Sequence, residues 1–360
     1  MTTDTAPRTL TNSYTAGKLP KAAPWAVLAI SLAVCLGAGL IMALSADEEF
    51  NWILSLIAGV VLFVLANWVM SRLVEGARQA ADRLVTSLVT AAFVLALIPL
   101  IWLTITVVVD GLPTLLNGTF LNSSMRNVVG EGGGALHAIV GTLLITGLAA
   151  LISIPIGLMT AIYLVEYGTG KLARGITFFV DVMTGIPSIV AGLATYALFA
   201  LLFGDGVRSG FAGSIALSIL MIPVVVRSSE EIMRLVPNEL REASYALGVP
   251  KWRTIVKIVL PTSIAGITTG IMLSISRVIG ETAPLLIVAG FTASMNYNPF
   301  SERMMSLPVF VYTQYVSPGT EADFYFERAW AGALTLIIIV ALLNAIARLV
   351  SHFFSPKLGR

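Results

Sequence analysis

Eight apolar runs, each long enough to cross a lipid bilayer as a helix, constrain this chain more than any other feature. The runs cover residues 24–46, 51–71, 84–109, 135–164, 175–203, 211–228, 262–290 and 330–353. A helix needs about 20 apolar residues to cross the roughly 30 Å hydrocarbon core of a membrane. Charged residues make up only 12% of the chain, about half the share in a soluble domain. The sequence therefore predicts an all-α polytopic membrane protein with about eight transmembrane helices.

The positions of Lys and Arg predict the orientation of these helices, because segments that stay in the cytoplasm carry an excess of both residues. With a cytoplasmic N-terminus, 17 of the 22 Lys and Arg residues fall in inside segments, four fall outside and one, Arg277, lies within a run. We therefore expect both termini in the cytoplasm.

The residue types within and around the apolar runs divide the chain into three parts. Residues 1–23 are rich in Thr, Ala and Pro and predict a disordered cytoplasmic tail. Residues 24–129 contain three plain apolar runs and an outer loop, and read as an N-terminal extension followed by one further helix. Residues 130–355 place Gly, Pro, Ser and Thr inside the runs, which is typical of closely packed membrane helices. The long outside segment 291–329 suits either a scoop that meets a delivery protein or a lid on a partner.

One inside segment, residues 229–261, interrupts the apolar pattern with basic residues. Asn238 is a candidate N-cap, Gly248 is placed to end the helix that follows, and Pro250 prevents its continuation. A second amphipathic stretch leads to Pro261, which we expect to open the next span. The shape suits a projection that inserts into a groove on a partner, and equally a basic loop held on anionic lipid.

Seven positions in this loop resemble the EAA loop of ABC-importer permeases, in which Glu-Ala-Ala, three residues, Gly and nine residues precede Ile-x-Leu-Pro. The matching residues are Glu242, Ala243, Ser244, Gly248, Ile258, Leu260 and Pro261. Ser244 in place of the second Ala is the one departure. The resemblance implies the type I importer permease fold, in which two permeases pair and each loop seats in the cleft of an ATP-binding subunit.

Several further stretches resemble the A-type permeases of phosphate-specific transport (Pst) systems. They are residues 132–146, 161–168, 184–193, 224–237 and 276–290. The resemblance implies a phosphate-importing permease of the bacterial plasma membrane, without catalysis, cofactor or nucleic acid of its own. It implies a second, PstC-like permease, a dimer of PstB-like ATP-binding subunits that hold ATP and Mg, and an extracytoplasmic PstS-like phosphate-binding protein. The family plan has six spans, so the first two runs here are extra.

Charged residues inside the apolar runs are the candidate substrate contacts. Arg277 falls about 16 residues after Pro261, deep in the predicted span 262–290, where a charge is costly and indicates function. Glu281 lies four residues later, where it would face Arg277 in a helix. Arg227 and Glu230 share one helix face near the inner end of the sixth run. The Pst resemblance associates Arg227, Glu230 and Arg277 with transport. Alternatively, Arg277 and Glu281 form an ion pair that holds helices in register, and Arg227 is a cytoplasmic charge that fixes the orientation of its span.

Other classes of function fit the sequence less well. A permease for another oxyanion, such as sulfate, molybdate or phosphonate, stays the nearest alternative. An ion-coupled secondary transporter would show inverted repeats, and a membrane enzyme would need a nucleophile or metal constellation, whereas the chain has two His and one Cys. The run Gly132-Gly133-Gly134 suits either an anion cradle of backbone N–H groups or a flexible start to the fourth span.

Overall fold

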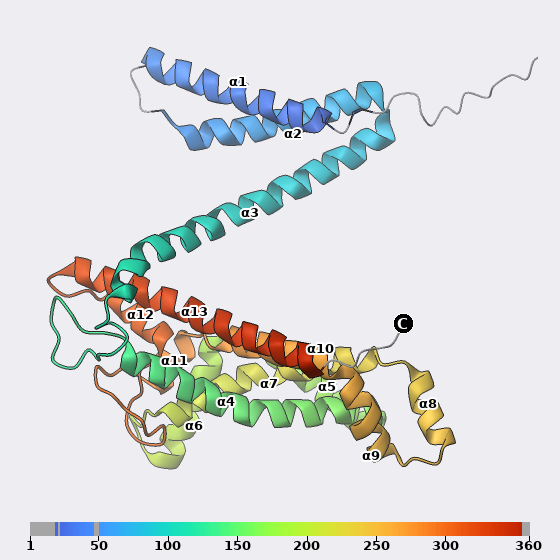
Figure 1. The fold of residues 1–360 in the computed structure, drawn as a ribbon, viewed down its shortest axis with the longest axis vertical. Coiled ribbons are helices and arrows are strands. Elements are labelled where there is room, and N and C mark those ends of the chain that lie inside the picture. Colours follow the sequence, from blue (N-terminus) through green and yellow to red (C-terminus); the bar gives the residue numbers. More distant parts are fainter. Residues whose placement is uncertain (1–18, 21, 47–49, 355–360) are drawn as a thin grey trace, which may run out of the picture. The chain divides into compact units, whose positions relative to one another are not determined.

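The computed structural model describes residues 19, 20, 22–46 and 50–354, with side chains described as far as residue 349. Every element in these ranges is a helix (Figure 1). The chain divides into two units, Met1–Thr104 and Ile105–Arg360. Most of the predicted tail, residues 1–18, lies outside the described residues.

The first unit contains a helical hairpin made of α1 (Ala23–Ala46) and α2 (Trp52–Val74), followed by the first part of α3 (Ala77–Leu116). The two hairpin helices pack along each other, because glycine lets their backbones approach. A Cβ atom at Gly59 would lie 3.2 Å from the backbone Cα of Leu32. The outer surfaces of both helices are apolar, as expected for helices that face lipid.

A buried carboxylate holds the connection between α2 and α3. Glu75 accepts hydrogen bonds from Ser71 Oγ at 2.8 Å and from the Leu19 N–H at 2.9 Å, and forms an ion pair of 2.6 Å with Arg83. Gly76 makes the turn with a φ of 94°, a conformation that glycine adopts at little cost. These contacts hold α2 and α3 together at the turn that connects them.

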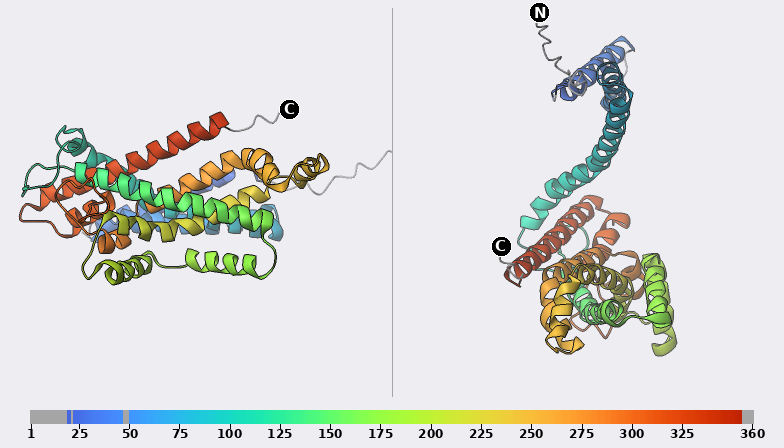
Figure 2. Two further views of the ribbon diagram at one scale, coloured as in Figure 1. Left: turned by 90° about the horizontal axis from the view of Figure 1, so that it is seen from below. Right: turned by 90° about the vertical axis from the view of Figure 1, so that its right-hand side faces the viewer.

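The core of the second unit is built on α4 (Leu136–Ile162), α7 (Gly210–Arg234), α10 (Leu260–Val278) and α13 (Ala322–Phe354) (Figure 2). Small residues bring α4 and α7 together: a Cβ atom at Gly157 would lie 2.7 Å from Val225 Cγ1. Ser214 Oγ donates to the carbonyl oxygen of Ile145 across the same contact at 3.0 Å. Small residues and hydroxyl groups serve as the contact surface because lipid supplies no hydrophobic drive for helices to associate.

The fifth predicted span is not a straight helix. In place of one run over 175–203, the structure has α5 (Gly170–Thr184) and α6 (Ser188–Phe203), which are bent by 107° at the break between them. The break holds Gly185 and Pro187. Proline removes a backbone donor and restricts the residue before it, so a helix ends there. Within the part of the chain that the structure describes, seven helices are long and apolar enough to cross a membrane, or eight if this bent pair forms one span.

The predicted span 262–290 also differs from the structure. A continuous helix begins earlier, with α9 (Lys251–Thr254) and the π-helical turn η2 (Ile255–Val259), and passes through Pro261 into α10. Pro261 therefore does not open the span. The wider turn of η2 lies immediately before Pro261, where a proline ring would otherwise clash with the preceding turn of the helix. At the far end α10 stops at Val278, and a short helix, α11 (Ala283–Val288), follows a break.

The segment 291–329 folds into the second unit. It contains α12 (Leu307–Val316) and the start of α13. Leu307, Val309 and Phe310 of α12 are fully buried among core residues of α4 and α13. Leu307 N–H also donates to Thr142 Oγ1 of α4 at 2.6 Å. Most of α12 is therefore a structural part of this core.

Candidate functional site

The loop singled out by the sequence forms a helix, a tight turn and a second helix at one end of the second unit (Figure 1). We call residues 229–261 the coupling loop. Its first helix, α8 (Asn238–Ala246), is followed by the C-cap residue Leu247 and then by Gly248, which has a φ of 73°. The Gly248 and Val249 N–H groups donate to the Tyr245 and Ser244 carbonyls at 2.9 and 3.2 Å. The predicted glycine turn is confirmed. The positive φ, and not a lack of space, requires glycine at this position, because an added Cβ atom would meet no atom within 4 Å.

The predicted cap of this helix is wrong. Pro237 occupies the N-cap position, without a side-chain cap, and Asn238 is already helical. The Asn238 side-chain oxygen instead accepts a hydrogen bond of 3.3 Å from Arg241. The predicted helix is present, but its first turn is held by an arginine rather than by an asparagine cap.

Ser244, the one departure from the EAA pattern, joins the two arms of the coupling loop. Its Oγ lies 2.8 Å from Thr254 Oγ1, and both side chains are buried. A hydroxyl in place of the methyl group of alanine therefore adds a hydrogen bond between α8 and α9. The small size that the position requires is kept.

Arg241 fastens α8 to the end of α4. Its Nε donates to Glu166 Oε1 at 3.0 Å, and its Nη atoms donate to the Val236 and Met233 carbonyls at 2.6 and 3.1 Å. Glu166 lies in η1 (Tyr163–Tyr167), the π-helical turn that ends α4, and its side chain is only 4% exposed. The carbonyl oxygen of Glu166 also accepts a hydrogen bond from Lys251 Nζ. Both arms of the loop are thus tied to one residue.

The free face of the coupling loop carries exposed apolar side chains among charged ones. Leu247 is 83% exposed and Trp252 57% exposed. Of the EAA positions, Glu242, Ala243 and Gly248 are also exposed. A rigid projection with exposed apolar side chains at its tip is the form of a surface that inserts into a partner groove.

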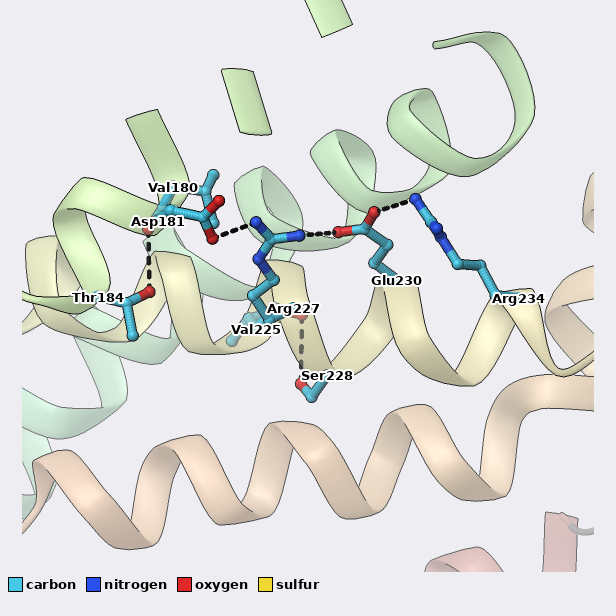
Figure 3. Close-up of polar contacts among 8 residues, drawn as sticks. All are labelled: Val180, Asp181, Thr184, Val225, Arg227, Ser228, Glu230 and Arg234. Carbon is cyan, nitrogen blue, oxygen red and sulfur yellow. Dashed lines mark hydrogen bonds and ion pairs between the residues drawn. The ribbon is translucent and has the colours of Figure 1, made fainter. Parts of the chain in front are cut away.

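A row of alternating charges connects α5 with α7 (Figure 3). Arg227 donates to Asp181 of α5 and, at 2.9 Å, to Glu230. Glu230, whose side chain is 4% exposed, pairs on its other side with Arg234 at 2.6 Å. Figure 3 shows the four side chains in the order Asp181, Arg227, Glu230, Arg234. The sequence predicted the neighbouring pair Arg227 and Glu230, and the structure places both in this charged row.

Arg277 and Glu281 do not pair. Arg277 is exposed in the last turn of α10, whereas Glu281 lies beyond the end of that helix. Among the residues that the structure describes, neither side chain forms an ion pair. The pairing that the spacing suggested is therefore wrong, because it assumed a helix that continues through Gly280.

Comparison with known proteins identifies the architecture. Residues 153–360 match the family described as binding-protein-dependent transport system inner membrane component. The chain belongs to this family. It is a permease subunit of an ABC importer, and a separate subunit of such importers hydrolyses ATP. The prediction of a permease is confirmed.

Curated relatives of this permease carry the PstA name. The chain is 48% identical over 275 residues to Phosphate transport system permease protein PstA 1 of Mycobacterium tuberculosis, covering 76% of the chain and 89% of the relative. It is 40% identical over 284 residues to the PstA protein of Pasteurella multocida, covering 78% of the chain and 96% of the relative. The A-type resemblance is thereby confirmed.

Solved structures support the type I fold. The permease resembles a chain of the bacterial alginate ABC transporter with a TM-score of 0.53 at 15% identity, covering 75% of the permease and 96% of that chain. It resembles a chain of the MetNI methionine ABC transporter with a TM-score of 0.51 at 20% identity, covering 61% and 96%. At such identities the likeness concerns the fold alone.

Three residues that organise the site were not predicted. They are Glu166, Arg241 and Asp181, each of which forms an ion pair described above. Each acts through a partner far away in sequence, so no local pattern could reveal it. Next to the glycine run, the Gly130 and Gly132 carbonyls accept hydrogen bonds from buried Arg328 at 2.6 and 2.9 Å, a contact that the sequence did not predict.

Proposed function

We propose that this chain is the A-type permease of an ATP-driven phosphate importer and forms half of the translocation path. The observation that carries the proposal is the 48% identity to a phosphate transport permease over 76% of the chain. Its partners would be a PstC-like second permease, two PstB-like ATP-binding subunits that hold ATP and Mg, and a PstS-like binding protein. The chain itself would bind no cofactor. We place it in the bacterial plasma membrane with both termini in the cytoplasm.

The coupling loop would dock in the cleft of an ATP-binding subunit. Support comes from its exposed tip, with Leu247 and Trp252 outward, and from the contacts that stiffen its base. Movement imposed on α8 would reach α4 through the Arg241–Glu166 pair. It would reach α10 along the unbroken helix that starts at Lys251. A rigid base is needed, because a flexible loop would absorb the movement of the motor instead of transmitting it.

The charged residues would contribute differently to the substrate path. Arg277 is exposed and has no acidic partner among the described residues, so its guanidinium is free to donate hydrogen bonds to an oxyanion. Arg227 is held between two carboxylates, which leaves it less able to bind an anion. We assign Arg277 to direct contact with phosphate. Arg227 and Glu230 would gate the inner end, and Glu281 would lie on the path beyond α10.

The test is ATP-dependent phosphate uptake by proteoliposomes that contain the chain, its second permease, the ATPase and the binding protein. Uptake that excess sulfate leaves unchanged would support the proposal. Sulfate uptake without phosphate uptake would keep the importer and overturn the substrate. Absence of ATP-dependent uptake of either anion, with all four components assembled, would overturn the proposed transport function.

A further inference from the structure

The segments between α6 and α7 and between α11 and α12 lie at the end of the second unit opposite the coupling loop (Figure 1), and each carries an arginine. Arg208 belongs to the segment between α6 and α7, and Arg303 to the segment between α11 and α12. Both side chains pack against Gly290, where a Cβ atom would lie 3.2 Å from the Cδ atom of each arginine. Two cationic side chains from distant parts of the sequence are thus neighbours across one glycine.

Backbone hydrogen bonds hold the segments that carry these arginines. The Ser209 N–H donates to the Val288 carbonyl and the Met304 N–H to the Ala289 carbonyl, each at 3.1 Å. These bonds involve the residues that directly follow Arg208 and Arg303, and both join them to the end of α11. The backbone that carries the two arginines is therefore held in place by the fold.

The pair lacks a counter-charge. Among the described residues, no carboxylate lies within ion-pair distance of either guanidinium, although the exposed Asp205 and Glu302 are near in sequence. The Nε atom of Arg208 is buried without a hydrogen-bond partner, and the Arg303 guanidinium lies 6.0 Å from the Phe291 ring. Like charges repel, and a buried donor without an acceptor is costly. An anion between the arginines would relieve both costs.

We propose that Arg208 and Arg303 form an oxyanion-binding site that receives phosphate at the outer mouth of the permease. The inference rests on the proposed function, because it takes the substrate and the sidedness from it. Two guanidinium groups offer several planar donors, which suit the oxygens of a tetrahedral anion. The more exposed Arg303 binds the anion first, and the less exposed Arg208 then binds it further into the permease. The site precedes Arg277 on the path and accepts phosphate as the binding protein releases it.

The experiment uses the complete importer in nanodiscs and proteoliposomes, with Arg208 and Arg303 both replaced by Gln. The matched control is Arg126→Gln, which removes an exposed arginine from the segment between α3 and α4. A second variant, Arg303→Lys, keeps the charge and loses the planar fork. The first readout is binding of inorganic phosphate without binding protein or ATP, followed as 31P line broadening. The second is phosphate uptake at limiting amounts of loaded binding protein.

For the double variant we expect phosphate binding and uptake at limiting binding protein to fall about tenfold or more, the effect of losing one or two charge-assisted hydrogen bonds. Arg126→Gln should match the unmodified protein, and Arg303→Lys should lie in between. Equal binding by the double variant and the unmodified protein would overturn the site, whatever the transport result. If the unmodified importer carried sulfate instead, and the double variant lost sulfate binding, the site would stand as an oxyanion site and the phosphate assignment would fall.

Discussion

Arg241 Nε lies 3.0 Å from Glu166 Oε1, and this pair joins the coupling loop to the end of α4. Both side chains are largely buried, at 12% and 4% exposure. Removal of one partner would leave the other charge buried and uncompensated, which costs about 3 kcal/mol in typical proteins. The Arg241–Glu166 pair is therefore one of the main contacts that hold α8 against the end of α4.

Glu166→Gln or Arg241→Gln alone should lower phosphate uptake much more than ATP hydrolysis, because α8 would no longer move together with α4. The two rates are measured on the same proteoliposomes. The double variant Glu166→Gln, Arg241→Gln leaves no buried unpaired charge and should recover part of the thermal stability that each single variant loses. Stability losses that simply add would show that the two residues act independently.

Gly248→Val should stop transport and leave the amount of permease in the membrane unchanged. The φ of 73° at this position is unfavourable for a β-branched residue, at a cost of about 1–3 kcal/mol, so the turn between α8 and α9 would change shape. Gly248→Asn is the control, because asparagine tolerates this conformation. Uptake assays and membrane immunoblots check the result. Equal loss with Asn and Val would mean that size at the surface matters, and not the turn.

Arg277→Leu should abolish phosphate uptake without lowering thermal stability, because no carboxylate is left unpaired. Arg227→Leu should lower stability as well, since it removes one of two partners of the buried Glu230. Melting curves of the purified proteins and uptake rates separate the two effects. If the Arg277→Leu variant failed to assemble with its partner subunits, Arg277 would have a structural role in the complex and not a role in binding phosphate.

Glu75 should make the first unit sensitive to acid. Burial alone raises the pKa of this carboxyl, but the hydrogen bonds from Arg83, the Leu19 N–H and Ser71, with the charge of Arg83, outweigh it and hold the pKa below its usual 4.5. A lowered folded-state pKa means that ionised Glu75 contributes stability fully above pH 4.5 and loses it as the pH falls through the folded-state value.

Glu75→Gln should therefore melt at a lower temperature than the unmodified protein near neutral pH, and this difference should shrink as the pH falls below 4.5. Thermal unfolding from pH 7 to pH 3 measures the difference. Asp82→Asn is the matched control, because Asp82 is exposed on α3 and forms no ion pair with any residue that the structure describes. A difference that stays constant across this range would contradict the role given to the ionised carboxylate.

Local patterns were enough for most of the spans and for the turn of the coupling loop. Runs of apolar residues predicted the spans, because a helix in lipid must satisfy its own backbone and cover itself with apolar side chains. Gly248 and Pro250 predicted the turn after α8 for a similar reason, since both act on the backbone where they stand. Motif spacing also identified the EAA positions.

Breaks within spans were harder to predict. The bend between α5 and α6 and the end of α10 at Val278 interrupt runs of high mean hydropathy, and hydropathy alone does not reveal such interruptions. The error at Arg277 and Glu281 followed directly, because helical spacing has no meaning once the helix stops. Neighbouring helices that can satisfy the freed backbone groups decide whether such a break is tolerated.

The sequence by itself determined that this chain crosses the membrane many times, where it turns in the coupling loop and which family pattern that loop carries. Only the tertiary structure decided that Glu166 meets Arg241, that Asp181 meets Arg227 and that Arg208 lies beside Arg303. Hydropathy and turn propensity act over a few neighbouring residues, whereas these contacts depend on which helices pack together. Folding brings these side chains into contact although they are far apart in the sequence, and no local sequence pattern predicts such contacts.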